Sequence, residues 1–535
     1  MSQFLDPTLE VSTPKQSGHK RTESSYSTSY SVLDIYETES PISARSPTTT
    51  NNELGDEIMR GLDELEFKDL SNDNTLFASN GSETEINSNS NLNLNLNLNS
   101  NSYIEERIEY ITPINNITNI KTILSSPYDM YGFKKKSNLS SITPEHYNQW
   151  FEQYSQYLLE RKQKWLSLMR TNGLNLPNDS TIPTRFPPKS AKVKKLIRKG
   201  IPPEWRGNAW FYYAGGYEKL SKHNGLYKEI ATNGVKNKDS DVIERDLDRT
   251  FPDNKYFKSN DNNEPKMIQS LRRVLTAFAH YKPQIGYCQS LNFLAGLLLL
   301  FMNEERSFWM LVILTERIIP NVHSHNLEGV HTDQGVLMLC IKEYINQLWP
   351  ILGKSFDGQL IAEDKILSNL PPIALVTSPW FMSLFVGVLP IESTLRIWDI
   401  LWYQGSKTIF RIGLTLFKMS SETNEFQELT STNSSQNDQV ELYQFMQSYP
   451  KSLLDPNEVL GNCFKKIGGY GYGSLSQAEI DTCREFVSKQ REKLNNKKKN
   501  TSIAVTDEER QTLLLGQDVH DVYGFHRSIM ILQIK

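Results

Sequence analysis

The feature that most restricts the fold of this chain is a helical hydrophobic pattern that runs from Leu196 to about Lys418. Apolar residues recur there at the three- and four-residue spacing of an amphipathic helix, and few segments show the alternation typical of a half-buried strand. Glycine and proline residues separate the segments. We therefore expect an almost all-α, multi-helix domain over residues 196–420.

The chain before this domain divides into two parts. Residues 1–125 are rich in Ser, Thr and Asn and contain the tract NSNSNLNLNLNLNSNS, which cannot bury enough apolar surface to offset the entropy of an ordered chain. We expect a disordered tail there. An accessory helical segment is expected over residues 126–195, because Thr143 is a suitable N-cap residue and Pro144 follows at the first helical position.

The chain after the domain is expected to form a polar insert and then a helical C-terminal extension, together covering residues 421–535. The insert is the Ser- and Asn-rich segment Ser420–Asp438. Helical spacing of apolar residues returns near residues 440–446 and 476–493.

Composition limits the compartments and partners that fit the chain. The net charge of -4 over 535 residues gives no reason to expect a nucleic-acid partner. The four cysteines are scattered without a CxxC pair, so we expect a reducing, cytoplasmic location. The most apolar run, Phe293–Met302, is shorter than the about 20 residues that a membrane span needs. We expect no transmembrane segment and no secretory signal.

One basic run leaves a peripheral membrane contact open. The segment Lys192–Lys199, KVKKLIRK, could touch acidic lipid or the acidic surface of a protein partner. A solvated helix face is the simpler interpretation of the same residues.

Motifs that would give the chain a nucleotide or metal site of its own are missing. The segment Gly405–Thr408 lacks both the Gly-Lys pair and the upstream glycine of a P-loop. A metal site could be imagined at a group of histidines and acids that comprises His323, His325, Glu328, His331 and Asp333. Their spacing matches no recognised ligand pattern, so we expect a histidine-bearing loop and no cofactor.

Two short patterns carry the chemical signal. The first is IxxDxxR over Ile243–Arg249, and the second is YxQ, in which Tyr287 precedes Gln289. Taken alone, Arg249 would be a surface ion pair with Asp246, and Gln289 a hydrogen-bonding residue of a buried helix. The two patterns together are more specific than either one.

With these patterns, the chain resembles the TBC (Tre-2/Bub2/Cdc16) domain family of Rab GTPase-activating proteins. The resemblance covers roughly residues 196–420, in the family's order. Its further elements are the opening GIPPEWRG at 200–207, GVHTDQGVL at 329–337, Trp380-Phe381 and RIWD at 396–399. The YGFKKK segment and the long tail look most like the fungal Rab GAPs of polarised secretion.

The resemblance implies that the chain accelerates GTP hydrolysis by GTP-bound Rab-family small GTPases, in vesicle traffic and exocytosis. Arg249 would be an arginine finger that neutralises charge in the transition state, and Gln289 a glutamine finger that orients the attacking water. Mg and GTP would be carried by the partner GTPase. Asp246 would orient Arg249, while Tyr287 and Arg206 would support the fold or contact the GTPase.

The chain departs from the family pattern at two places. Gln404-Gly405 stands where many members have Glu-Gly, and Ser290-Leu291 replaces the commoner Gly-Met after the glutamine. Neither departure removes a finger, but the second changes the surroundings of Gln289.

Two other functions remain compatible with the sequence. One is a non-catalytic scaffold that binds a GTPase, although retention of both fingers argues against it. The other is a polarity adaptor that acts through the N-terminal tail and the terminal helices, and the tail is a candidate docking segment for polarity scaffold proteins. The tail would also recruit the chain from the cytoplasm to sites of polarised growth or to secretory membranes. The sequence does not specify which Rab is the substrate.

Overall fold

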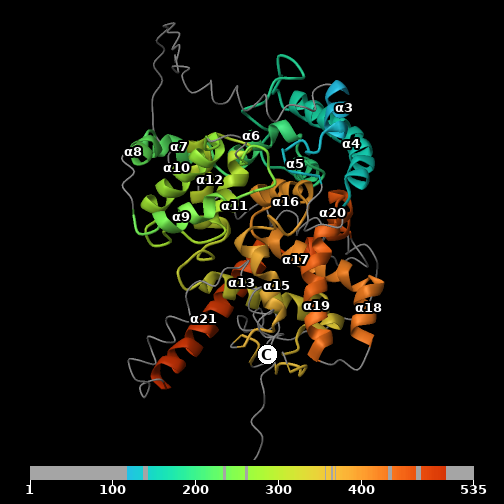
Figure 1. Ribbon diagram of the computed structural model, residues 1–535, viewed down its shortest axis with the longest axis vertical. Helices are drawn as coiled ribbons and strands as arrows, with labels where there is room; N and C mark the ends of the chain where they lie inside the picture. Colours follow the sequence, from blue (N-terminus) through green and yellow to red (C-terminus); the bar gives the residue numbers. More distant parts are fainter. Residues whose placement is uncertain are drawn as a thin grey trace, which may run out of the picture.

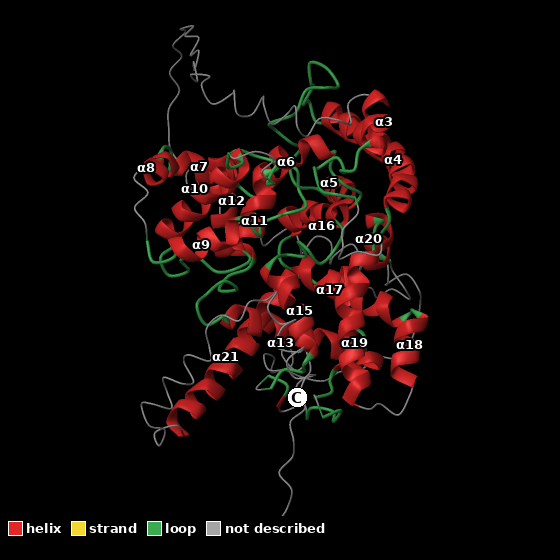
Figure 2. Ribbon diagram, in the orientation of Figure 1, coloured by secondary structure: helices red, strands yellow, loops and turns green. Residues whose placement is uncertain are grey.

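The structure is a computed structural model built from helices and loops (Figures 1 and 2). It describes residues 117–135, 142–232, 237–258, 263–355, 357–362, 365–367, 369–431, 436–465 and 472–501. Among these residues no β-sheet forms, and backbone pairing of the strand type is limited to isolated bridges such as that of Tyr128 with Lys134. The expected all-α fold class is confirmed for the described part of the chain.

Three helices form an N-terminal layer, and a first helical group follows them (Figure 1). The layer consists of α3 (Ile117–Ser125), α4 (Pro144–Thr171) and α5 (Ala191–Arg198). The first group consists of the short η4 (Pro203–Trp205), α6 (Arg206–Tyr213), α7 (Gly216–Lys222), α8 (Leu226–Thr232), α9 (Ser240–Leu247), α10 (Lys266–Tyr281), α11 (Leu291–Leu299), α12 (Glu304–Ile313) and the π-helical turn η5 (Leu314–Ile318).

A second helical group lies below the first in Figure 1. It consists of α13 (Glu328–Tyr344), η6 (Asn346–Leu348), α14 (Trp349–Leu352), α15 (Ile373–Met382), α17 (Lys407–Ser421), α18 (Asn424–Ser431), α19 (Gln436–Ser448), η8 (Tyr449–Ser452), α20 (Pro456–Phe464), η9 (Tyr472–Ser474) and α21 (Gln477–Thr501). Helix α16 (Ile391–Gln404) contacts α6, α5, α17 and α20, so it joins both groups to the N-terminal layer.

Helix α10 organises the first group. Its buried residues Leu271, Val274, Leu275 and Phe278 follow the i, i+3, i+4, i+7 spacing and form one apolar face. The helix packs against α8, α9, α11 and α12. It therefore holds in place the ends of α9 and α11, between which the candidate site is built.

The N-terminal boundary differs from the sequence-based one. Helix α4 starts as predicted, with the Thr143 side chain accepting a hydrogen bond from the His146 N–H at 3.2 Å. However, α3 occupies the last nine residues of the segment expected to be a tail. So short a helix has a weak sequence signal, and its order comes from packing against α4, with Ile123 buried. Residues 1–116, the rest of the expected tail, lie outside the described part.

The C-terminal extension is part of the same core. Helix α20 packs on α17, and α21 packs on α13. Arg484 in α21 binds Asp333 in α13 through two hydrogen bonds, of 2.6 and 2.9 Å. The fit is close, since a Cβ added to Gly335 would lie 2.8 Å from a methyl group of Val487. The polar insert expected at 420–438 also contains α18, whose Phe426 is buried.

We predict that a chain ending at residue 475 will be several kcal/mol less stable than the full chain. The truncation removes the fully buried Ile480 and Val487, and burying one such side chain contributes about 1.5–3 kcal/mol. Urea unfolding followed by circular dichroism measures the change. A chain ending at residue 501 keeps α21 and serves as the control. Equal midpoints for these two truncated chains would contradict the prediction.

None of the described helices combines the length and the apolar character that crossing a membrane would require.

Candidate functional site

Arg249 lies in the loop that follows α9, directly after the helix C-cap Asp248. Its Nε donates to Asp246 Oδ1 at 2.8 Å, and its Nη2 lies 2.6 Å from the same oxygen. The Arg249 side chain is 40% exposed, whereas that of Asp246 is 2% exposed. A buried carboxylate therefore holds the guanidinium of an arginine that reaches the surface.

Gln289 lies in the loop between α10 and α11. The loop turns at Gly286, where φ is 62° and an added Cβ would lie 2.5 Å from a carboxylate oxygen of Asp239, so glycine suits both the conformation and the space. Gln289 itself is buried, with 8% of its surface exposed. The turn thus places Gln289 at the start of α11 and close beneath the surface.

Asp246 joins the two loops. Its second carboxylate oxygen, Oδ2, accepts a hydrogen bond from the Tyr287 hydroxyl. Burial and the charge of Asp246 raise the pKa of Tyr287 well above its ordinary value, so the hydroxyl stays protonated and donates. One carboxylate thereby fixes Arg249 on one side and the loop of Gln289 on the other.

A second tie runs parallel to the first. Asn292 Nδ2 donates to Thr250 Oγ1 at 2.8 Å, and Thr250 Oγ1 donates to the Asp246 carbonyl at 2.7 Å. Thr250 directly follows Arg249, and Asn292 lies in the first turn of α11. Sequence reasoning missed both residues. The available signal was an asparagine at the beginning of a strongly apolar run, since a buried amide needs polar partners.

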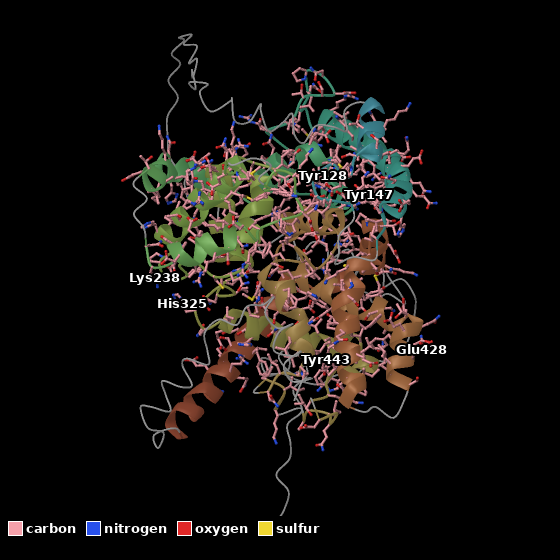
Figure 3. All side chains as sticks on the ribbon, viewed as in Figure 1. Tyr128, Tyr147, Lys238, His325, Glu428 and Tyr443 are labelled. Carbon is pink, nitrogen blue, oxygen red and sulfur yellow. The ribbon has the colours of Figure 1, made fainter. Side chains whose placement is uncertain are left out.

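The site lies where the two helical groups meet. Figure 3 labels Lys238, just before α9, and His325, in the loop before α13, and both lie on the left edge of the molecule at that level. The contacts of Asp246 bring Arg249, Tyr287 and the loop of Gln289 together.

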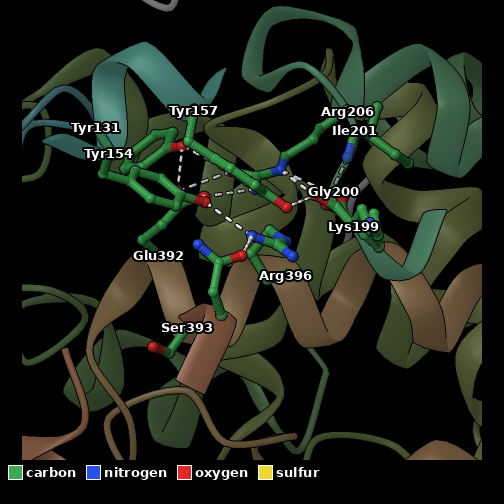
Figure 4. Close-up of polar contacts among 12 residues, drawn as sticks. Tyr131, Tyr154, Tyr157, Lys199, Gly200, Ile201, Arg206, Glu392, Ser393 and Arg396 are labelled. Atoms are coloured by element: carbon green, nitrogen blue, oxygen red, sulfur yellow. Dashed lines mark hydrogen bonds and ion pairs between the residues drawn. The ribbon is translucent and has the colours of Figure 1, made fainter. Parts of the chain in front are cut away.

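Arg206, which the sequence suggested as a supporting residue, lies elsewhere. It is fully buried between α6 and α16, where it pairs with Glu392 at 2.8 Å (Figure 4) and with Asp399 at 3.2 Å. It also donates to the Tyr131 hydroxyl at 2.6 Å. Burial acts to raise the pKa of Glu392, but Arg206 and two tyrosine hydroxyls outweigh it and hold that pKa below its ordinary value. We interpret Arg206 as a core residue that joins α6, α16 and the segment before α4.

We predict that Arg206→Met will destabilise the fold by about 3–5 kcal/mol, because it leaves two buried carboxylates without their cation. Thermal unfolding measures the loss. Lys164→Ala, which removes an exposed ion pair with Glu160, is the control and should change little. If the two variants unfold at the same temperature, the buried cluster does not have the structural role assigned to it.

Three of the five residues considered as a metal site have other partners. Glu328 and Asp333 form ion pairs with Arg491 and Arg484 of α21. His323 is buried against the end of α15, where its Nε2 lies 3.0 Å from the Met382 carbonyl. Among the described residues, no group of three His, Cys, Asp or Glu side chains is arranged to hold a metal ion.

Comparison with known proteins gives matches over most of the chain. The sequence profile of the Rab-GTPase-TBC domain matches residues 203–424. The Saccharomyces cerevisiae GTPase-activating protein GYP3 is 42% identical over 474 residues, which cover 77% of this chain and 73% of that protein. The GTPase-activating protein MSB4 of the same organism is 41% identical, over 68% of this chain and 82% of that protein. A solved RabGAP TBC domain from Chlamydomonas flagella is 25% identical, covers 63% of this chain and all of that one, and superposes with a TM-score of 0.47.

Proposed function

Since the chain belongs to the Rab-GTPase-TBC domain family, we propose that it is a GTPase-activating protein for Rab-family small GTPases. In this proposal Arg249 and Gln289 enter the nucleotide site of the GTPase in trans. The observation that carries the assignment of these two residues is the shared Asp246 carboxylate. It holds Arg249 directly and, through Tyr287, fixes the loop of Gln289, so both side chains are presented from one place.

The chemistry of GTP hydrolysis explains the arginine. The reaction passes through a loose phosphoryl transition state whose charge must be neutralised. A guanidinium stays protonated and can donate to two oxygens at once. In the free chain, Arg249 rests on Asp246 with its side chain 40% exposed, so it can reach a docked GTPase without unfolding any helix.

GTP hydrolysis also requires that the attacking water be held in line with the leaving group, and Gln289 would meet this requirement. Its amide offers both a donor and an acceptor and does not titrate. Gln289 would take the place of the glutamine that the GTPase itself carries. GTP and Mg arrive bound to the partner, which agrees with the lack of a P-loop motif in this sequence.

The decisive experiment is single-turnover GTP hydrolysis measured across a panel of GTP-loaded Rab proteins. We expect strong stimulation of at least one member, and the panel also identifies the preferred substrate. The Arg249→Ala chain, run beside the native one, corrects for effects of binding alone. A flat panel for both chains would support the non-catalytic scaffold instead.

We also propose a role in vesicle traffic and exocytosis, with the N-terminal residues directing the cytoplasmic chain to sites of polarised growth or to secretory membranes through polarity scaffold proteins.

Deleting residues 1–116 removes the polar segment and keeps α3, so we predict that hydrolysis is largely retained while placement in the cell changes. Fluorescence microscopy and the panel assay on the same variant measure the two effects. Loss of stimulation by the truncated chain would show that the catalytic unit extends into these residues.

A further inference from the structure

The residue after Gln289 has a backbone conformation that is unfavourable for its type. Ser290 has a φ of 91°, in the left-handed region that glycine adopts more easily than any residue with a Cβ. Its side chain is buried, with 4% of the residue exposed. Its hydroxyl donates to the Met382 carbonyl at 3.1 Å and lies 3.1 Å from His323 Nε2. A glycine would relax the backbone but could not make these contacts.

His323 is also in an unfavourable environment, because one of its ring nitrogens is buried without a hydrogen-bond partner among the described residues. Its Nε2 lies 3.0 Å from the Met382 carbonyl, and since a carbonyl only accepts, we place the ring hydrogen on Nε2. The bare Nδ1 is buried and has no hydrogen-bond partner among the described residues. Burial lowers the pKa of His323 to about 4, so the ring is neutral at pH 7. All the polar contacts described for this side chain are therefore made through Nε2.

Met382, the third member of the cluster, lies in a different helical group from Ser290. Met382 is the last residue of α15, and the carbonyls at a helix C-terminus have no partner inside the helix. The Met382 carbonyl accepts from Ser290 and His323 instead. Ser290 precedes α11 of the first helical group, whereas α15 belongs to the second group (Figure 1). The cluster of Ser290, His323 and Met382 thus connects the two groups directly beside Gln289.

Gln289 is anchored on both sides as a result. Tyr287 ties the preceding residues to Asp246, and Ser290 ties the following residues to Met382. We propose that Ser290 and His323 are positioning residues for Gln289: they fix the backbone of its loop against α15 so that the amide meets the attacking water. This inference rests on the proposed function of Gln289. It adds a second anchor for Gln289, on α15, that does not pass through Asp246, the residue that holds Arg249.

Three variants separate positioning from folding, and a fourth, Gln289→Ala, is the reference. Ser290→Gly relieves the backbone and removes the hydroxyl. His323→Gln and His323→Asn are both neutral amides and differ by one methylene, but the glutamine amide can occupy the place of Nε2, whereas the asparagine amide reaches only the place of Nδ1. Gln289→Ala marks the complete loss of the finger. Each chain is assayed by single-turnover hydrolysis on a panel Rab that the native chain stimulates, in the form whose own switch glutamine is replaced by leucine.

We expect Ser290→Gly and His323→Asn to lower the maximal rate about 10- to 100-fold, which is the scale of a misplaced catalytic group. The KM for the GTPase and the melting temperature should stay near native values, and His323→Gln should recover most of the rate. Because all three contacts form one unit, the double variant of Ser290→Gly and His323→Asn should lose little more than either single one.

The outcomes distinguish this inference from the proposed function. If Gln289→Ala abolishes stimulation while Ser290→Gly and His323→Asn act like the native chain, the positioning role is wrong and the glutamine finger stands. If Gln289→Ala stimulates normally, the finger and the positioning role fall together. If a variant loses rate only because less of it is folded, as a lowered melting temperature shows, the cluster only stabilises the fold. The same conclusion holds if the glutamine and asparagine variants of His323 have equal rates.

Discussion

Replacing Arg249 with alanine is expected to lower the stimulated rate of GTP hydrolysis about 10³- to 10⁵-fold, the range found when an arginine finger is lost. This is roughly 4–7 kcal/mol of the activation barrier. Arg249→Lys should fail almost as completely, because an ammonium group keeps the charge but cannot donate to two oxygens in a fixed plane. Single-turnover hydrolysis at saturating chain, on a Rab that the native chain stimulates, measures the effect.

The fold should survive either substitution. The Arg249 side chain is partly exposed, and the Asp246 carboxylate keeps the Tyr287 hydroxyl as a donor after the guanidinium is gone. Arg245→Ala is the matched control, since Arg245 is an exposed arginine of α9, the helix that precedes Arg249, and its Nε donates to the backbone carbonyl of Asp241. Full stimulation by the lysine variant, with unchanged melting, would mean that Arg249 is only a surface ion pair.

Local signals explain what could be predicted from the sequence. The helical spacing of α10 and the Thr143-Pro144 start of α4 depend on residues close together in the chain, and the structure contains both as expected. The IxxDxxR pattern likewise indicated the contact between Asp246 and Arg249, which lie three residues apart.

The features that could not be predicted from the sequence depend on contacts between residues far apart in the chain. The pairing of Asn292 with Thr250 joins helix ends that no short pattern relates. Arg206 stood in a matched motif, but a motif gives residue types and not burial, and only the structure places it between Glu392 and Asp399. The return of α21 onto α13 depends on Arg484 meeting Asp333, and the two lie far apart in the sequence. A domain boundary drawn at residue 420 from composition could not anticipate it.

Gln289→Ala is expected to lower the stimulated rate about 10²- to 10³-fold, the scale of losing one transition-state hydrogen-bond donor. The loss should occur on an unmodified Rab and despite an intact Arg249, because the two residues meet different needs of the same transition state. The native chain should also still stimulate a Rab whose switch glutamine is replaced by leucine, since Gln289 supplies the missing group from outside.

The competing explanation is that Gln289, with only 8% of its surface exposed, serves the fold at the start of α11. Measuring both the melting temperature and the rate distinguishes the catalytic from the structural explanation. If Gln289 is catalytic, the alanine variant melts near the native temperature and loses rate on both forms of the Rab, whereas a structural Gln289 lowers melting and leaves the rate per folded molecule unchanged. Gln284→Ala is the control within the same loop, because Gln284 is exposed. A folded Gln289→Ala chain with normal stimulation would leave Arg249 as the single finger, with the GTPase positioning its own water.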